Sequence, residues 1–317
     1  MKKVLVVYYS QTGQLTRIVQ SMMAPLVADP SIEVVMEALR PEPDYPFPWP
    51  LLKFFDTFPE TVASMPAALA EPGFDGQARF DVIVLAYTVW FLSPSLPVTG
   101  FLQSARGREA LRDTPVITVI GCRNMWLMAQ EKVKGLLAAA GGRLIDNVVF
   151  VDRGSSLATF ITTPYWMLTG KREALFGLLP RAGVSEEDIR GAARFGRAIA
   201  EALSHGVPDG SAPLLRGLEA ARADIRLLTS EKVGARSFKV WGSLLRALGS
   251  PGSVPRLAVL CMYIAFLVTL ILTVVPVSMA VRALLRPLFR KRHEALKTYY
   301  EQPSGSDNFR MKEFQDA

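Results

Sequence analysis

Cysteine and histidine are scarce in this sequence, and their scarcity excludes several kinds of site. The two cysteines, Cys122 and Cys261, are too few for a disulfide framework, and Cys261 falls inside a long apolar stretch. The two histidines, His205 and His293, have polar or basic neighbours, which leaves no residues for a histidine metal site or a histidine-based catalytic triad. We therefore expect no metal, no disulfide and a reducing compartment, which favours the cytoplasm for the large domain.

Signatures of nucleotide and nucleic-acid binding are also absent. The turn after the first apolar run has neither the G-x-G-x-x-G spacing of dinucleotide-binding turns nor the G-x-x-x-x-G-K-[ST] spacing of NTP-binding loops. Aromatic residues do not interleave with the basic residues in any nucleic-acid motif. We therefore expect no nucleic acid among the partners.

Negative charge is in the minority, with 36 Lys and Arg against 29 Asp and Glu and a net charge of +7. The positive excess surrounds Leu257–Val281, whose 25 residues carry no charge and exceed the roughly 20 residues that cross a bilayer. This pattern favours an anionic membrane surface as a partner and the cytoplasmic face of the inner membrane as the location. The flanking basic residues are Arg236, Lys239, Arg246 and Arg256 before the segment, and Arg282, Arg286, Arg290, Lys291 and Arg292 after it.

Two membrane arrangements of Leu257–Val281 are open. A single span is preferred, although it places the basic residues after Val281 outside, against the positive-inside tendency. Pro276 near the end of the segment can instead kink it into a re-entrant or interfacial arrangement with both flanks in the cytoplasm.

Five apolar runs alternate with helical patterns through the first two thirds of the chain. Unbroken apolar runs are typical of parallel strands buried on both faces, and short connections favour an open, doubly wound α/β sheet. The expected strands are Val4–Tyr8, Ile32–Ala38, Asp81–Tyr87, Thr114–Ile120 and Leu144–Val151, and the expected helices are 14–27, Val98–Leu111, Leu127–Ala140 and Ser185–His205.

Around this domain, residues 1–205, we expect insertions and appendages. Residues 40–75 begin with a proline-rich stretch and a short helix at Leu51–Phe58, and they either cap a pocket, form a dimer surface or cover the sheet edge. Residues 154–180 are an aromatic excursion over a pocket or toward a membrane. The remaining expected parts are a basic linker at 206–252 with helices at Leu214–Leu228 and Phe238–Leu248, the membrane anchor at 253–293 and a disordered polar tail at 294–317.

The first strand leads into a turn that suits an anion. No Lys or Arg lies between Lys3 and Arg17, so main-chain amides at a helix N-terminus and nearby hydroxyls would hold the ligand. The turn resembles the FMN-phosphate loop S/T-x-T-G-x-T of flavodoxins, with Leu15 as a departure where flavodoxins usually have Thr. The candidate cofactor-binding residues are Ser10, Gln11, Thr12, Gly13, Gln14, Leu15 and Thr16.

Two further loops leave the same expected edge of the sheet, Thr88–Ser93 and Gly121–Trp126. Both loops contain aromatic and polar residues. Aromatic faces can stack on an isoalloxazine ring and polar groups can bond to its edge, and Arg123 can stabilise an anionic reduced flavin. We therefore expect FMN as the cofactor. The candidate residues in these loops are Thr88, Val89, Trp90, Phe91, Gly121, Arg123, Asn124 and Trp126.

Longer motifs carry a more specific resemblance. The stretch YTVWFLSPSLPVTGFL looks like the flavin-contacting segment of flavodoxin-like NAD(P)H:quinone oxidoreductases. The stretches VLVVYYSQTGQLT, PFPWPL, VITVIGCRNMWLMAQEKVK, VDR and RPLFRKR resemble the bacterial family of dialkylresorcinol condensing enzymes, flavodoxin-like proteins of dialkylresorcinol and aryl-polyene pathways. A condensing role needs a nucleophilic cysteine with histidine partners, which this chain lacks. An aromatase role fits better.

The resemblance implies an FMN-dependent oxidation of a dialkyl-cyclohexanedione to a dialkylresorcinol. Arg123, Tyr87 and Tyr165 are the candidates for holding the enolate. A membrane-anchored NAD(P)H:quinone oxidoreductase, a flavodoxin-type electron carrier and a non-enzymatic scaffold are the alternatives. The expected partners are a hydrophobic small molecule, membrane lipid, the pathway ketosynthase and a second copy of the chain.

Overall fold

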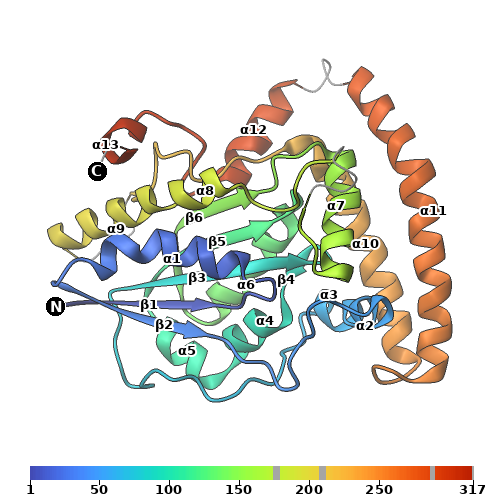
Figure 1. Ribbon diagram of the computed structural model, residues 1–317, viewed down its shortest axis with the longest axis horizontal. Coiled ribbons are helices and arrows are strands. Elements are labelled where there is room, and N and C mark those ends of the chain that lie inside the picture. Colours follow the sequence, from blue (N-terminus) through green and yellow to red (C-terminus); the bar gives the residue numbers. More distant parts are fainter. Residues whose placement is uncertain (174–178, 207–211, 286–289, 316–317) are drawn as a thin grey trace.

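Five parallel strands form the centre of the molecule, which is a computed structural model describing residues 1–173, 179–206, 212–285 and 290–315 (Figure 1). Their spatial order is β2-β1-β3-β5-β6, and the two-residue β4 pairs antiparallel with the end of β3. In chain order these are strands two, one, three, four and five, the flavodoxin-like arrangement with a switch point between β1 and β3. The predicted α/β, doubly wound five-stranded sheet is confirmed. The strands are β1 (Lys2–Tyr8), β2 (Ile32–Ala38), β3 (Val82–Trp90), β4 (Ser93–Pro94), β5 (Pro115–Cys122) and β6 (Arg143–Val151).

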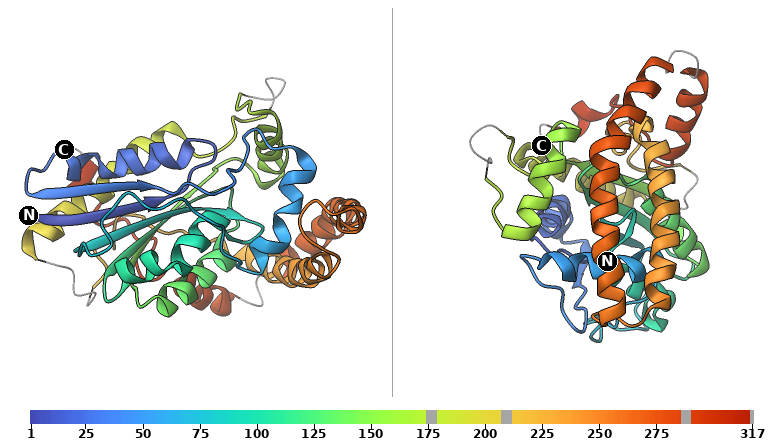
Figure 2. Two further views of the ribbon diagram at one scale, coloured as in Figure 1. Left: turned by 90° about the horizontal axis from the view of Figure 1, so that it is seen from below. Right: turned by 90° about the vertical axis from the view of Figure 1, so that its right-hand side faces the viewer.

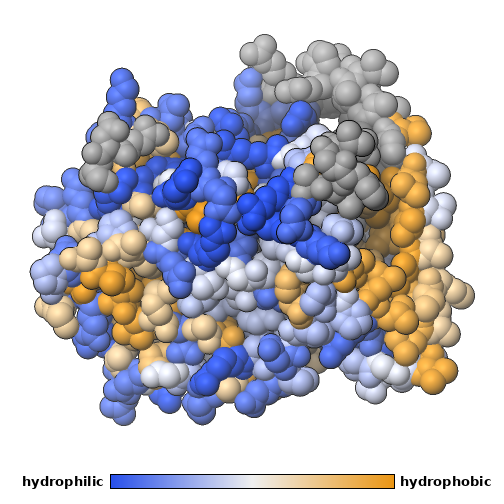
Figure 3. Space-filling view, in the orientation of Figure 1, coloured by the Kyte–Doolittle hydropathy of each residue, from blue (hydrophilic) through white to orange (hydrophobic). Residues whose placement is uncertain are grey.

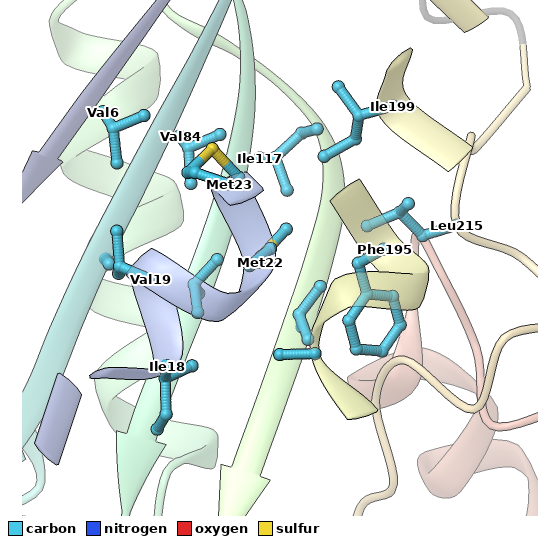
Figure 4. Close-up of a cluster of buried hydrophobic side chains, with 14 of the residues drawn as sticks. Val6, Ile18, Val19, Met22, Met23, Val84, Ile117, Phe195, Ile199 and Leu215 are labelled. Carbon is cyan, nitrogen blue, oxygen red and sulfur yellow. The ribbon is translucent and has the colours of Figure 1, made fainter. Parts of the chain in front are cut away.

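Helices cover both faces of the sheet (Figure 2). One face carries α1 (Gln14–Val27), α8 (Glu186–Gly191) and α9 (Ala193–His205), and the other carries α4 (Leu96–Gln103), α5 (Ala105–Leu111) and α6 (Leu127–Ala139). Side chains alternate between the faces, so Val4 and Val6 pack under α1 while Leu5 and Val7 pack on the opposite side. Figure 4 shows the first of these cores, where α1 and α9 lie side by side over the strands, with Met22 of α1 near Phe195 of α9.

The segment Val98–Leu111 forms two helices, whereas one was expected. Ser104 breaks the helix with an extended backbone (ψ 156°), and its Oγ accepts a hydrogen bond of 2.9 Å from Gly107 N. A serine N-cap is a strong start signal, so α5 begins there as a separate helix.

The two insertions contact each other over the carboxyl edge of the sheet. The first contains α2 (Leu51–Asp56) and α3 (Phe58–Val62), and the second forms α7 (Ser156–Thr169). Trp49 N donates to Met167 O at 2.8 Å, and the rings of Phe47 and Trp166 lie edge to face, 6.3 Å apart. Residues 174–178 of the second insertion lie outside the described residues.

The helix expected at Leu214–Leu228 is wrong. Residues 214–224 run as irregular chain along β6, where Val149 N donates to Ala220 O at 2.8 Å. Gly217 and Glu219 have φ values of +82° and +55°, which a right-handed helix does not contain. One long helix, α10 (Ile225–Ala247), follows in place of a separate helix at Phe238–Leu248.

The disordered tail is also a wrong expectation. After α11 (Val254–Leu285), α12 (Arg290–Glu301) returns to the domain, and the chain continues to α13 (Met311–Gln315). Tyr300, Ser304 and Phe314 are buried, and Glu219 N and Ala221 N donate to tail carbonyls at 2.7 and 2.9 Å. The tail is ordered because a few buried residues dock it over the segment that covers the β6 edge, although its composition is polar.

Candidate functional site

The turn Ser10–Thr16 joins β1 to α1 at the switch point of the sheet. Ser10 Oγ accepts from Thr16 N at 3.2 Å and Thr12 Oγ1 accepts from Gln14 N at 3.4 Å, so the turn is closed on itself. Gly13 caps the helix with φ +75°, and a Cβ built there meets nothing within 4 Å. Among the described residues no acceptor is bonded to the amides of Gln11, Thr12, Gly13 and Leu15. Open amides at a helix N-terminus form an anion site, so this turn fits a phosphate.

The side chains of Gln11, Gln14 and Leu15 attach the turn to other parts of the domain. Gln11 Nε2 donates to Pro46 O at 2.8 Å and so attaches the proline-rich insertion. The Gln14 amide group bonds both ways with Val184, at 3.3 Å to its carbonyl and 3.1 Å from its N–H. Leu15 is buried in the core against Gly121. These residues can serve a phosphate only through their main chain, and Leu15 has a packing role where flavodoxins have a hydroxyl.

A cavity of about 480 Å³ opens beside the turn, between the end of β1 and the segment after β2. Its lining includes Ser10 and Thr16 from the turn, the rings of Tyr9 and Tyr45, and Arg40 and Asp44. The two rings lie edge to face with centroids 6.3 Å apart, and burial raises the pKa of Tyr45 to about 12. The cavity is therefore lined by both aromatic and polar side chains.

Two polar side chains at the neighbouring strand ends are buried without partners. The register pairs Tyr8 with Ala86 and Thr88 with Gly121, so Ser10, Thr88 and Gly121 lie at one edge of the sheet. Among the described residues, Thr88 Oγ1 and Asn124 Oδ1 are buried and have no hydrogen-bond partner. An unsatisfied buried polar atom is costly, so these two positions suit the polar edge of a ligand.

The aromatic residues expected to stack on a flavin are used for packing. Trp126 is 1% exposed in the core and Trp90 is 5% exposed in a cluster with Tyr9, Tyr45 and Trp49. The prediction that Trp90 and Trp126 offer open faces is wrong, because the insertion covers one and the core encloses the other.

Phe91 and Val89 also have structural roles. Phe91 packs against Phe54, Phe58 and Phe238, which joins the end of β3 to the C-terminal helices. Val89 pairs with Pro94 in β4. The polar residues of the three loops fit an FMN molecule better than their aromatic residues do.

Of the three candidate catalytic residues, Tyr87 is excluded. Its side chain is fully buried, its hydroxyl donates to Gln130 Oε1 at 2.6 Å, and burial raises its pKa well above the ordinary value. Arg123 is half-buried, its guanidinium lies 5.2 Å from the Phe160 ring centroid, and burial lowers its pKa. Tyr165 is half-buried on α7 and stays a prediction.

The sequence analysis missed Glu231, which α10 brings to the Gly121–Trp126 loop. Glu231 is fully buried, and its Oε2 accepts from Met128 N at 2.9 Å in the first turn of α6. Burial raises the pKa of this carboxyl to about 7, although backbone amides of the α6 N-terminus act in the opposite direction. The available signal is that Glu231 is the one acidic residue between Ile225 and His293 in the sequence.

No protein-family model and no curated protein matches this sequence significantly. Among solved structures, similar chains include a flavoprotein in complex with FMN from Lactobacillus acidophilus NCFM, at 14% identity, 47% coverage of this chain, 93% of that chain and a TM-score of 0.37. A flavodoxin, WrbA-like protein from Agrobacterium tumefaciens has 12% identity, coverages of 65% and 99% and a TM-score of 0.38. An oxidised flavodoxin 1 from Bacillus cereus has 13% identity, coverages of 64% and 99% and a TM-score of 0.32.

Proposed function

We propose that this protein binds FMN and uses it as an oxidoreductase. The observation that carries the proposal is the set of open amides in the turn Ser10–Thr16, at the β1/β3 switch point of a flavodoxin-like sheet. Ligands of doubly wound sheets bind at this point, and in flavodoxins, which have this strand order, the ligand is FMN. The buried, unpartnered Thr88 Oγ1 and Asn124 Oδ1 beside the turn support the same ligand.

The residues divide into two groups by the part of FMN that each would hold. The amides of Gln11, Thr12, Gly13 and Leu15 would bind the phosphate without a countercharge from Lys or Arg. The side chains of Thr88 and Asn124 would donate to and accept from the polar edge of the ring. When bound, FMN supplies a two-electron acceptor for a hydride.

We further propose that the substrate is a dialkyl-cyclohexanedione, oxidised to the dialkylresorcinol. The reaction removes two electrons and two protons: one proton leaves the carbon next to a ring ketone, and a hydride leaves the adjacent carbon. A 1,3-dione is acidic by itself, so a strong protein base is not needed. The motif resemblance supports this substrate.

Arg123 is the residue we assign to the enolate oxygen. Among the described residues no carboxylate forms an ion pair with it, and burial lowers its pKa because the charged form is poorly solvated. A cation in this position gains by binding an anion. Asp152 lies near enough to stabilise the Arg123 charge in the absence of a ligand.

The test has two steps. The purified full chain should carry a flavin spectrum and release FMN on heat denaturation; a colourless protein that does not take up FMN would contradict the cofactor. The flavoprotein should then convert a dialkyl-cyclohexane-1,3-dione to the resorcinol with a quinone as terminal acceptor and without NAD(P)H. Rapid NAD(P)H oxidation by quinone with no resorcinol formed would instead support the quinone oxidoreductase alternative.

A further inference from the structure

The helix α11 is apolar all round, and only one of its sides is covered by protein. It is the one helix of the described chain that is long and apolar enough to cross a membrane, with a mean hydropathy of 2.7 over Val254–Val274. On its inner side Leu260 and Tyr263 are fully buried against Phe58 and Leu245. Elsewhere its surface is open (Figure 3): the exposed large residues of the part whose burial is described are Val254, Met262, Phe266, Val268, Leu272, Val274 and Val277, and from Val268 onward they point to different sides of the helix.

The first turn of α11 is fastened to the flavodoxin-like domain by a buried ion cluster. Arg256 has no exposed side-chain area; its Nε donates to Asp56 Oδ1 at 2.7 Å and its Nη2 to Glu60 Oε2 at 2.7 Å. Asp56 also accepts from Gly252 N at 2.7 Å, so the turn before α11 is held by the same carboxylate. This end of α11 therefore cannot leave the domain without exposing the buried charges of Arg256 and Asp56 and breaking their ion pairs.

The chain beyond α11 is fastened to the same domain at another point. Ala223 N donates to Glu301 Oε1 at 2.9 Å, and Ser304 Oγ donates to Asp146 Oδ1 at 2.6 Å. Asn147 N donates to Ser304 Oγ at 2.8 Å. The side chains of Ser304, Asp146 and Asn147 are all buried. Both flanks of the apolar helix are thus docked on one body, and α11 lies along its side next to α10 (Figures 1 and 2).

We propose that the protein is monotopic: the open sides of α11 and α10 lie in the surface of an anionic lipid bilayer, and both flanks of α11 stay on the cytoplasmic side. A spanning helix would place its two ends on opposite sides of a hydrocarbon core about 30 Å thick. The docked ends exclude this, because α10 and the chain after α12 are attached to the same domain. A helix that is apolar all round needs two apolar partners, and here the partners are the domain on one side and lipid on the other.

The charge of the neighbouring surface favours lipid over a second copy of the chain. Between Ile225 and His293 the sequence has eleven Lys and Arg residues and one acidic residue, the buried Glu231. On α10 the exposed Arg236, Lys239 and Arg246 stand among the exposed apolar residues Val233, Val240 and Leu244. Basic residues among apolar ones suit anionic headgroups, whereas two copies of this surface would repel each other.

The arrangement is tested by cysteine labelling of the full chain in membranes of an expressing bacterium. In a Cys122→Ala, Cys261→Ala background, single cysteines are placed by Gln77→Cys in the domain and Lys312→Cys in the tail, both at exposed positions. A membrane-impermeant maleimide should label both in inverted vesicles and neither in intact spheroplasts. Labelling of the two positions from opposite sides would show a span and overturn the proposal.

Lipid contact is tested separately with outer-face variants. The double change Val268→Lys, Leu272→Lys should move the protein from the membrane to the soluble fraction by at least tenfold, with monomeric protein recovered. Val27→Lys, at a 65% exposed apolar residue of α1, is the matched control and should leave the partition unchanged. A wild-type chain that is soluble, or soluble as a dimer that this double change dissociates, would overturn the proposal in favour of a protein partner.

Discussion

The turn Ser10–Thr16 is stabilised by contacts between residues close in the sequence, whereas the C-terminal third of the chain is stabilised by contacts between residues far apart in it. The turn is closed by hydrogen bonds between residues two and six positions apart. The C-terminal third is docked by Arg256 on Asp56, 200 positions away, and by Ser304 on Asn147, 157 positions away. The first region can be recognised from a short motif, whereas the second depends on polar pairs that no local pattern reveals.

The strongest test of this difference is Arg256→Met. Removing the cation leaves Asp56 and Glu60 facing each other with their partner gone, and breaking a buried pair of this kind costs about 3–5 kcal/mol of unfolding free energy. Chemical denaturation measures the loss, and the exposed Arg246→Met should change stability by less than about 0.5 kcal/mol. Adding Asp56→Asn and Glu60→Gln to Arg256→Met should restore at least half; a loss as small as that of Arg246→Met would contradict the docking cluster.

The second test is the pH dependence of stability, through Glu231. Its pKa in the folded protein is raised to about 7 from 4.5, so the folded state binds this proton more tightly than the unfolded chain does. The associated stability is present below pH 4.5 and is lost as the pH rises through 7, by on the order of 3 kcal/mol. Asp146, with its pKa raised to about 6, changes stability in the same direction. The unfolding free energy should differ less between pH 5 and pH 8 for Glu231→Gln than for the wild type. An unchanged difference would show that Glu231 does not cause the pH dependence.

The third test is Ser304→Ala, which removes a hydroxyl bonded to Asp146 and to the amide of Asn147. Leaving buried polar groups without a partner costs roughly 1–3 kcal/mol, and the tail should become sensitive to protease at lower denaturant. Ser243→Ala, at an exposed position of α10, is the matched control. Equal protease resistance in both variants would mean that the tail is held by other contacts.

The smallest effect is expected in the turn itself, from Gly13→Ala. The left-handed backbone at φ +75° costs an alanine about 1–2 kcal/mol, which corresponds to roughly 5- to 30-fold weaker FMN binding if the variant turn relaxes. Riboflavin, which lacks the phosphate, should bind both proteins equally. Gly135→Ala in α6, where a Cβ also meets nothing within 4 Å, serves as the control and should leave FMN affinity unchanged. If the variant bound riboflavin and FMN with equally reduced affinity, the assignment of the phosphate to this turn would be contradicted.

The strands and the phosphate turn were predictable because their signals are local. Unbroken apolar runs marked β1, β3 and β5, and a Gly between hydroxyl residues marked the turn. The roles of Trp90 and Trp126 were not predictable from the sequence, since an aromatic residue in a loop stacks on a ligand or packs in a core according to what covers it. Glu231 was missed for the same reason: only the fold brings α10 to the first turn of α6.

By itself the sequence determined the α/β class, the order of strands and helices, the position of the anion turn and the presence of one long apolar segment. It did so because a strand buried on two faces has an unbroken apolar run, and a helix that starts after a strand has a short motif at its first turn. Tertiary structure alone decided which side chains remain open in the site, that the tail is ordered and that both flanks of α11 dock on one domain. The physical reason is that contacts between residues far apart in the sequence determine these features: aromatic packing of Trp49 on Trp90 covers the site, and the buried bonds of Arg256 and Ser304 dock the C-terminal part.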